Sequence, residues 1–223
     1  RRVFTDAPDA HQDLFPEDIG LGPYDTAYRA YTRRERQLSD LRSRSATKSL
    51  HPSAAPLAAG LIGWWAFDED GPVAFDYSGN RIGGILRSAP PRVPGVDGKG
   101  LACQSGCVEV PNDPILSPLD GLTLECWVKA RQAKQHDKWF MNRIFPGDVA
   151  TGYALGLDRG RPAFRLPLTD WSHQLTSDIE MPTGRWVHLA ATFDGQTMRL
   201  YMDGQERGQL TRSGRVNPNN FSL

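Results

Sequence analysis

The sequence predicts an all-β fold, a two-sheet antiparallel β-sandwich, preceded by an N-terminal arm and one amphipathic α-helix. From residue 61 onward, short runs of β-branched and aromatic residues alternate with turn residues at about ten-residue spacing. Near the end, residues 197–202 alternate polar and apolar side chains between two dipeptides, Asp194-Gly195 and Asp203-Gly204. This alternation is typical of an antiparallel strand with one face on a core, and Asp194-Gly195 predicts a type I′ turn.

The first 56 residues differ in character from the rest of the chain. Residues 1–23 carry scattered prolines without a hydrophobic period, which predicts an extended arm. In residues 24–47, apolar side chains recur at three- and four-residue steps among arginines, which predicts an amphipathic helix with Asp25 as its N-cap. Residues 48–56 are rich in proline and small residues and predict a linker. Because a narrow apolar stripe needs a surface to cover, we expect the helix to contact another subunit or the remainder of a longer chain.

Residues 57–223 are predicted to form the sandwich domain itself. Its strands are expected, from the runs and the turn residues between them, near residues 61–67, 82–87, 101–103, 107–110, 122–129, 138–145, 152–158, 161–166, 173–177, 186–194, 197–202 and 205–210.

Several motifs, taken in order, resemble those of one known family. The run Gly-Arg-Trp-Val-His-Leu-Ala-Ala-Thr-Phe-Asp-Gly at 184–195, followed by Met-Arg-Leu-Tyr-Met-Asp-Gly, is similar to the signature hairpin of laminin-G-like, concanavalin A-like jelly-roll domains. Matching motifs stand upstream in the family's order, at residues 60–69, 76–80, 98–101 and 121–129. The resemblance covers residues 60–223 and implies a jelly roll of the kind found in secreted and surface proteins. This fold hosts lectins, enzymes and adhesive spacers alike.

The resemblance also implies that the last strands of the domain are missing. Similar domains close with one or two further strands, the last of which lies beside the first. We therefore expect an open sheet edge along residues 61–67, covered by another subunit or by a continuation of the chain. The chain starts at Arg1 without Met or a signal peptide, which favours a piece of a longer protein.

Composition narrows the classes of partner. The 26 Lys and Arg residues balance the 26 Asp and Glu residues, so no overall field favours nucleic acid or a charged membrane. No apolar run approaches the roughly 18 residues that a transmembrane helix needs. We expect a glycan or protein partner and an extracytoplasmic location, which is secreted, periplasmic or on the cell surface.

Catalytic motifs are missing from the sequence. Glycosidases that share this sandwich carry carboxylates two residues apart along one strand, so that one can attack while another donates a proton. Here Glu125 stands alone, and Asp178 and Glu180 run into a turn. The sequence therefore predicts that the chain is not an enzyme.

The loop that follows residues 61–67 has two interpretations, and the first is a calcium (Ca²⁺) site. Asp68, Asp76 and Asn80 offer carboxylate and amide oxygens, which suit a hard cation with six to eight oxygen ligands. The resemblance supports a structural calcium at this rim. In the alternative, the loop is an Asx-type turn whose side chains bond to its own backbone.

Carbohydrate binding requires exposed aromatic rings with hydrogen-bonding neighbours. Four residues are candidates for ligand contact: Trp171 and His173 in a polar loop, Tyr153, and Trp139. The alternative for each is packing inside the domain.

Three cysteines have structural interpretations. Cys103 and Cys107 either form a disulfide across a tight hairpin or remain two half-buried thiols. Cys126 lies on the core face of residues 122–129 and is expected to be an inert buried thiol.

Together these observations predict a non-catalytic recognition or adhesion module of a larger multidomain protein. The alternative is a purely structural module that packs against a neighbouring subunit of a larger assembly or of a multidomain enzyme, haem-containing or hydrolytic. A glycosidase is the least favoured interpretation.

Overall fold

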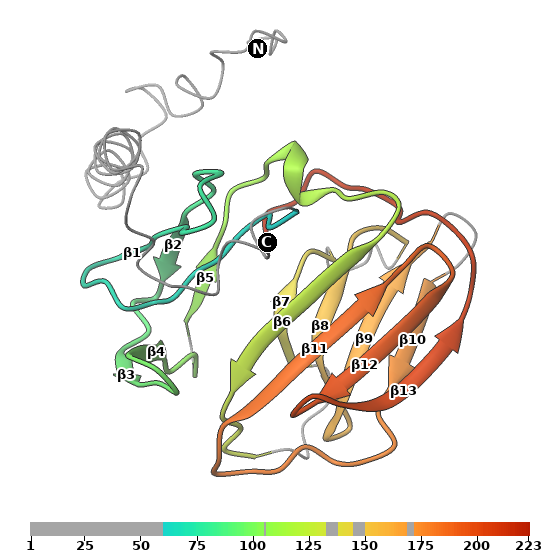
Figure 1. Ribbon diagram of the computed structural model, residues 1–223. Coiled ribbons are helices and arrows are strands. Elements are labelled where there is room, and N and C mark those ends of the chain that lie inside the picture. The colour runs from blue at the N-terminus through green and yellow to red at the C-terminus, as the bar shows by residue number, and fades with distance from the viewer. Residues whose placement is uncertain (1–59, 105, 133–137, 145–149, 169–171) are drawn as a thin grey trace, which may run out of the picture.

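Two four-stranded antiparallel sheets stack face to face and form a β-sandwich (Figure 1). The structure is a computed structural model and describes residues 60–104, 106–132, 138–144, 150–168 and 172–223. The predicted arm (1–23), helix (24–47) and linker (48–56) lie outside the described residues, and so does Trp171. The predicted all-β sandwich is confirmed. Among the described residues, no helix has both the length and the apolar character that crossing a membrane requires.

The front sheet is nearer the viewer in Figure 1 and has the strand order β13-β12-β11-β6. Its strands are β6 (Leu122–Val128), β11 (Val187–Phe193), β12 (Thr197–Met202) and β13 (Gln205–Thr211). The back sheet has the order β10-β9-β8-β7, with β7 (Lys138–Asn142), β8 (Ala154–Asp158), β9 (Arg161–Pro167) and β10 (Ser172–Thr176). Each of these strands matches a predicted run to within a few residues.

The main core lies between the two sheets, because every second residue of a strand points inward. The predicted alternation in β12 is confirmed, since Met198, Leu200 and Met202 all join this core. Leu155 and Phe164 reach it from the back sheet with no exposed surface. Burying one such side chain stabilises the fold by roughly 1.5–3 kcal/mol, so these two inner faces hold the sandwich together.

A smaller body of strands stands beside the β6 edge of the sandwich (Figure 1). One sheet has the order β1-β2-β5, and a separate hairpin joins β3 to β4. Their bounds are β1 (Val73–Ala74), β2 (Gly84–Arg87), β3 (Arg92–Pro94), β4 (Lys99–Leu101) and β5 (Cys107–Glu109), followed by a 3₁₀-helix, η3 (Pro114–Leu116). A second, small hydrophobic cluster of Ile82, Val110 and Leu116 supports this body.

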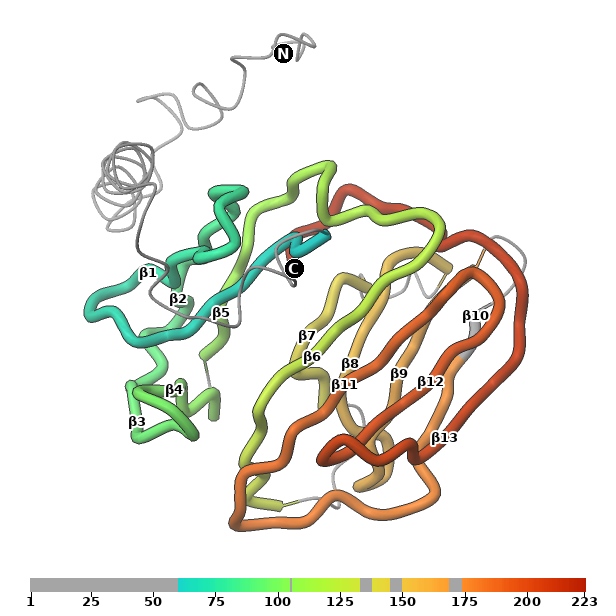
Figure 2. Tube along the Cα trace, viewed as in Figure 1, coloured from blue at the N-terminus to red at the C-terminus, as the bar shows by residue number. Residues whose placement is uncertain are grey.

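The last residues of the chain join the small cluster to the sandwich. Val110 N–H donates to the Leu223 carbonyl oxygen at 2.8 Å, and Leu223 N–H donates back to the Val110 carbonyl at 3.0 Å. Figure 2 shows this end of the chain beside β5. The Leu223 side chain packs against both hydrophobic clusters.

Arg143, directly after β7, is the largest fully buried side chain of the described residues, at 1% exposure. Its guanidinium donates to the carbonyl oxygens of Leu116, Asn219 (2.9 Å) and Phe221 (3.0 Å), and to the side-chain oxygens of Asn112 (2.6 Å) and Ser117 (2.7 Å). Burial lowers the pKa of Arg143, and the neighbouring Tyr153 opposes this shift. One side chain thus ties the back sheet to the segment around η3 and to the C-terminal segment.

The predicted strand at residues 61–67 was wrong. Only Trp65 forms a β-bridge, with Asp76, and the segment is otherwise irregular. Its backbone groups bond instead to the loop at 76–80: Ser78 Oγ donates to the Ile62 carbonyl, and Tyr77 N–H donates to the Trp64 carbonyl. The expected open edge at this segment is therefore not formed by a strand.

The turn prediction at Asp194-Gly195 was also wrong. Only Gly195 has a positive φ there, at 88°, whereas a type I′ turn needs two such residues. The loop is instead held by Asp194, whose Oδ1 accepts the N–H groups of Gln196 (3.0 Å) and Thr197 (2.7 Å). A bond from Arg199, together with these two, lowers the pKa of Asp194 to about 2. By contrast, Asp203 and Gly204 both have positive φ, as a type I′ turn requires.

Candidate functional site

Asp76, one of the predicted calcium ligands, is 1% exposed. Its Oδ1 accepts the N–H groups of Trp64 (3.0 Å) and Ser78 (2.8 Å). Its Oδ2 accepts the Ser78 hydroxyl (2.8 Å) and the Ile82 N–H (3.1 Å). Each carboxylate oxygen therefore already has two hydrogen-bond donors from the protein.

Asn80 supports the same segment from the other end of the loop. Its side-chain amide donates to the carbonyl oxygens of Leu61 and Ile62, at 2.9 Å each. Its backbone N–H donates to the hydroxyl of Ser78 at 3.2 Å. The Asp76–Ser78 bond and this last contact form the Asx-type turn that the sequence offered as the alternative to calcium, whereas the Asn80 amide bonds to a segment distant in the sequence.

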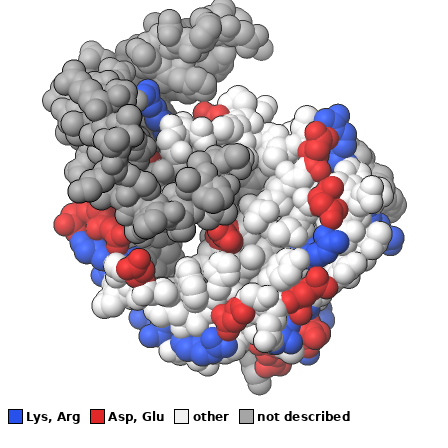
Figure 3. Space-filling model, in the orientation of Figure 1, with Lys and Arg blue, Asp and Glu red and all other residues white. Residues whose placement is uncertain are grey.

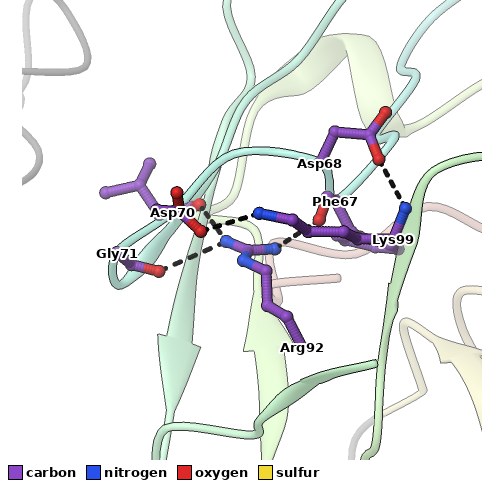
Figure 4. A network of polar contacts seen from close by, with 7 residues as sticks. Phe67, Asp68, Asp70, Gly71, Arg92 and Lys99 are labelled. Atoms are coloured by element: carbon purple, nitrogen blue, oxygen red, sulfur yellow. Dashed lines mark hydrogen bonds and ion pairs between the residues drawn. The ribbon is translucent and has the colours of Figure 1, made fainter. Parts of the chain in front are cut away.

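Asp68, the third predicted ligand, belongs to a different polar network, shown in Figure 4. Its Oδ1 accepts the backbone N–H of Lys99 at 2.6 Å, while Lys99 Nζ pairs with Asp70 at 2.8 Å and lowers the pKa of that carboxyl. Arg92 crosses the same loop and donates to the carbonyl oxygens of Phe67 (2.7 Å), Gly71 and Val73. The described residues hold no group of three His, Cys, Asp or Glu side chains arranged for a metal.

The side chains of Asp68, Asp76 and Asn80 are thus each bonded to groups of the protein in this structure. Calcium stays a prediction, and its test is the midpoint of thermal unfolding with added calcium and with a chelator. We expect the same midpoint in both, because the Asp76 oxygens are already used. A ligand at a hundred times its dissociation constant stabilises by about 2.7 kcal/mol, or several degrees. A rise of that size that Asn80→Ala abolishes would restore the calcium site.

Among the predicted ligand-contact residues, Tyr153 is buried. It is 4% exposed, and its hydroxyl donates to the carbonyl oxygen of Leu116 at 3.0 Å. A ring enclosed in this way offers no face to a ligand, so Tyr153 is left out of the site. His173 lies in β10 opposite Leu166.

Trp139 stands in β7 and is half-buried. The Arg165 guanidinium lies over its ring, with 4.8 Å from Cζ to the ring centroid. Because a cation covers this ring face, Trp139 is not a free platform for a sugar.

Among the described residues, the most exposed tryptophan is Trp127 of β6, at 52%. Leu124 and Cys126 of the same strand face the main core, so the alternation turns Trp127 and Glu125 to the outer face of the front sheet. Trp127 lies opposite His188 in the register of β6 and β11. The two rings are 5.1 Å apart between centroids and tilted by 53°.

Polar groups surround this ring. Glu125 Oε2 is 3.7 Å from His188 Nε2, and the Glu125 side chain is 67% exposed. Ala190 lies opposite Glu125 and also opposite Tyr201, so a small residue separates the two larger ones. We call Trp127, Glu125, His188 and Tyr201 the Trp127 face. Figure 3 views the molecule from this side and shows charged side chains gathered toward the β13 border.

Sequence reasoning missed Trp127 as a ligand-contact candidate, although a signal was present. The core face at Leu122, Leu124, Cys126 and Val128 requires the residues between them to point outward. The same argument leaves Cys126 on the inner side, where burial raises the pKa of its thiol to about 12 and makes it inert, as predicted. Cys103 and Cys107 are exposed thiols, unbridged in this structure.

Comparison with known proteins agrees with the sandwich architecture. Residues 104–223 match the family model described as the concanavalin A-like lectin/glucanases superfamily. Mouse (Mus musculus) pappalysin-1 is 32% identical over 103 residues, which cover 40% of this chain and 6% of that protein. The chain therefore corresponds to a small part of that curated relative.

Two solved structures share the fold at low sequence identity. The binding domain of Paraclostridial Mosquitocidal Protein 1 has a TM-score of 0.58 at 15% identity, with 74% of this chain and 44% of that chain covered. Domain 4 of AbnA, an extracellular arabinanase of Geobacillus stearothermophilus in complex with arabinotriose, has a TM-score of 0.55 at 19% identity, with 73% and 81% covered. At these identities the similarity establishes the shape of the chain and leaves its ligand to be argued from its own residues.

Proposed function

We propose that this chain, which belongs to the concanavalin A-like lectin/glucanase superfamily, is a non-catalytic module that binds a glycan through the Trp127 face. The observation that carries the proposal is the half-exposed indole of Trp127 on the outer face of the front sheet. Exposure of this much apolar surface to water is unfavourable in free energy. A ligand that covers the indole would remove that cost, since burial of apolar surface is worth roughly 25 cal/mol per Å².

The neighbours of Trp127 suit a sugar. A pyranose ring has an apolar face that stacks on an indole, and hydroxyl groups at its edge that need acceptors and donors. Glu125 supplies an exposed carboxylate and His188 a ring nitrogen, both beside the indole. The arabinanase domain named above was crystallised with arabinotriose, so one protein of this fold holds a saccharide.

The same face lacks the arrangement that glycoside hydrolysis needs. In the row of paired residues that crosses the outer face from Glu125, Ala190 and Tyr201 precede the other carboxylate of that row, Glu206, while Asp203 at the end of the face is bonded to the His188 N–H and to Arg185. Three strand spacings separate Glu125 from Glu206 by roughly 14 Å. Catalytic carboxyl pairs stand about 5–9.5 Å apart, so binding without hydrolysis is the favoured role.

We also propose that the module acts outside the cytoplasm as part of a larger protein. Two observations support this setting: the fold is shared with a domain of an extracellular arabinanase, and the curated relative is far longer than this chain.

The test is a binding measurement on immobilised neutral oligosaccharides, arabino-oligosaccharides included, with wild type and Trp127→Ala. We expect Trp127→Ala to weaken binding by about tenfold to a hundredfold, because the stacked ring contributes roughly 1.5–3 kcal/mol. Trp127→Phe should retain part of the affinity. The matched control is Phe140→Ala on β7, which removes a ring that is 36% exposed on the other sheet.

Two results would overturn the proposal. Equal binding by wild type and Trp127→Ala would mean that the sugar binds to another surface. Failure of wild type to bind any saccharide, while Trp127→Ala breaks a complex with a protein partner, would favour the purely structural, subunit-packing module.

A further inference from the structure

A second polar cluster crosses the outer face of the back sheet, on the far side of the sandwich from the Trp127 face. Each strand contributes one half-buried residue: Trp139 of β7, Asp158 of β8, Arg165 of β9 and Gln174 of β10. Ala163 lies among them with no exposed surface, although its place in β9 turns it outward. A small residue there lets the longer side chains lie across the sheet.

Arg165 is held in one orientation. Its guanidinium stacks over the Trp139 ring, and its Nε and Nη2 both donate to Oε1 of Gln174, at 3.2 and 2.8 Å. A guanidinium has five N–H groups, so these two bonds leave both of Nη1 and one of Nη2. One N–H of each nitrogen points end-on, side by side. That edge matches an anion with two oxygen atoms.

Within the part of the chain that the structure describes, no direct ion pair balances the positive charge of Arg165. No carboxylate of the described residues lies within 4.0 Å of it, whereas Arg87, Arg185, Arg199 and Arg215 each have such a partner. Gln174, its hydrogen-bond acceptor, is neutral. The cluster therefore presents a fixed cation with donors to spare.

Asp158 stands at the other end of the same cluster. Its Oδ2 accepts the Gln174 amide N–H at 3.0 Å, so one carboxamide separates the cation from the carboxylate. A ligand that fits both must carry an anionic group beside hydroxyl donors. An acidic peptide would bring further carboxylates against Asp158, whereas an acidic sugar carries one carboxylate on a ring of hydroxyl groups.

We infer that the Trp139, Asp158, Arg165 and Gln174 cluster is a second binding site, for the carboxylate of an acidic saccharide. The inference rests on the proposed glycan-binding function but uses the opposite sheet. Arg165 binds the carboxylate end-on, and Asp158 accepts a sugar hydroxyl.

The experiment compares binding of oligogalacturonate and of its methyl ester, which has the same sugar without the charge. We expect wild type to bind the acid more tightly than the ester, and the difference to shrink as salt is raised. Arg165→Gln should weaken binding of the acid by about tenfold or more and leave binding of the ester unchanged. Arg165→Lys, which keeps the charge but loses the planar edge, should fall between them. Arg212→Gln, at an exposed arginine after β13, is the matched control.

The unfolding midpoint of Arg165→Gln shows whether the variant is folded. If wild type binds acid and ester equally, or binds neither, or if Arg165→Gln binds the acid as wild type does, the inference is overturned. Trp127→Ala separates this site from the first. If Arg165→Gln abolishes binding of the acid while Trp127→Ala affects no sugar, the Arg165 site is supported and the Trp127 face is excluded as a binding site.

Discussion

Replacing Arg143 by alanine is expected to lower the free energy of unfolding by roughly 3–5 kcal/mol, because it removes several hydrogen bonds to a charged group, each worth about 1.5–3 kcal/mol and not fully additive. The guanidinium reaches three carbonyl oxygens and two side-chain oxygens in a place with 1% exposure. Without it, each of these five acceptors would lose one charged donor, although the Leu116 carbonyl keeps the Tyr153 hydroxyl and the Asn219 carbonyl keeps the Ser117 hydroxyl. A buried polar group left unsatisfied costs about 1–3 kcal/mol.

The thermal unfolding midpoint measures this effect. A domain of this size loses about 2–4 °C per kcal/mol, so Arg143→Ala should melt roughly 10 °C below wild type. Arg143→Lys should recover little, because a lysine ammonium cannot reach acceptors on three sides with a planar fork. Arg212→Ala, at an exposed arginine, should stay within a degree or two. A midpoint for Arg143→Ala close to that of Arg212→Ala would show that water replaces the guanidinium at little cost.

Asp76→Ala is expected to cost roughly 3 kcal/mol, with the loss confined mainly to residues 61–82. Three backbone N–H groups, of Trp64, Ser78 and Ile82, donate to this carboxylate and would lose their acceptor. Because these donors fix the irregular segment before β1, its removal should loosen that segment before it loosens the sandwich.

Amide hydrogen exchange resolves this prediction residue by residue. The amides of Trp64, Ser78 and Ile82 should exchange faster in Asp76→Ala, while those of β11 and β12 keep their protection. Asp97→Ala removes an exposed carboxylate from the same body and serves as the control. Unchanged exchange at Trp64 and Ile82 would mean that other groups hold the segment.

The strands of the sandwich could be predicted because their sequence signals are local. In β12, polar and apolar residues alternate without interruption, and both bounds were predicted correctly. The run at 61–67 has similar hydrophobic content, but its backbone partners are the side chains of Asp76, Ser78 and Asn80, which are 12 to 19 residues away. A hydrophobic pattern within the run itself cannot indicate hydrogen bonds to residues so far away in the sequence. Strands of two or three residues, such as β1 and β3, are too short to show a period.

The candidate site was harder to predict than the fold. Tyr153 and Trp127 are both aromatic residues near polar neighbours in the sequence, yet one is 4% exposed and the other 52%. The difference arises because η3 and Arg143 enclose Tyr153, and these contacts join distant parts of the chain. For Trp127, strand alternation alone would have sufficed. The Arg165 cluster could not be predicted without the order of the four back-sheet strands, and this order is not evident from the sequence.

The two hydrophobic clusters meet at one side chain, Leu223, which packs against both. Each cluster is otherwise built from its own apolar residues, and the further connections between them are polar, since Arg143 and Tyr153 both donate to the Leu116 carbonyl oxygen. We therefore expect the small body to open as a cooperative unit of its own. The free energy of opening the small unit is then set by Asp76, by its three-residue cluster and by these few connections, and not by the large core. Mutations in the sandwich core would change global stability while the small unit continues to open and close at its own rate.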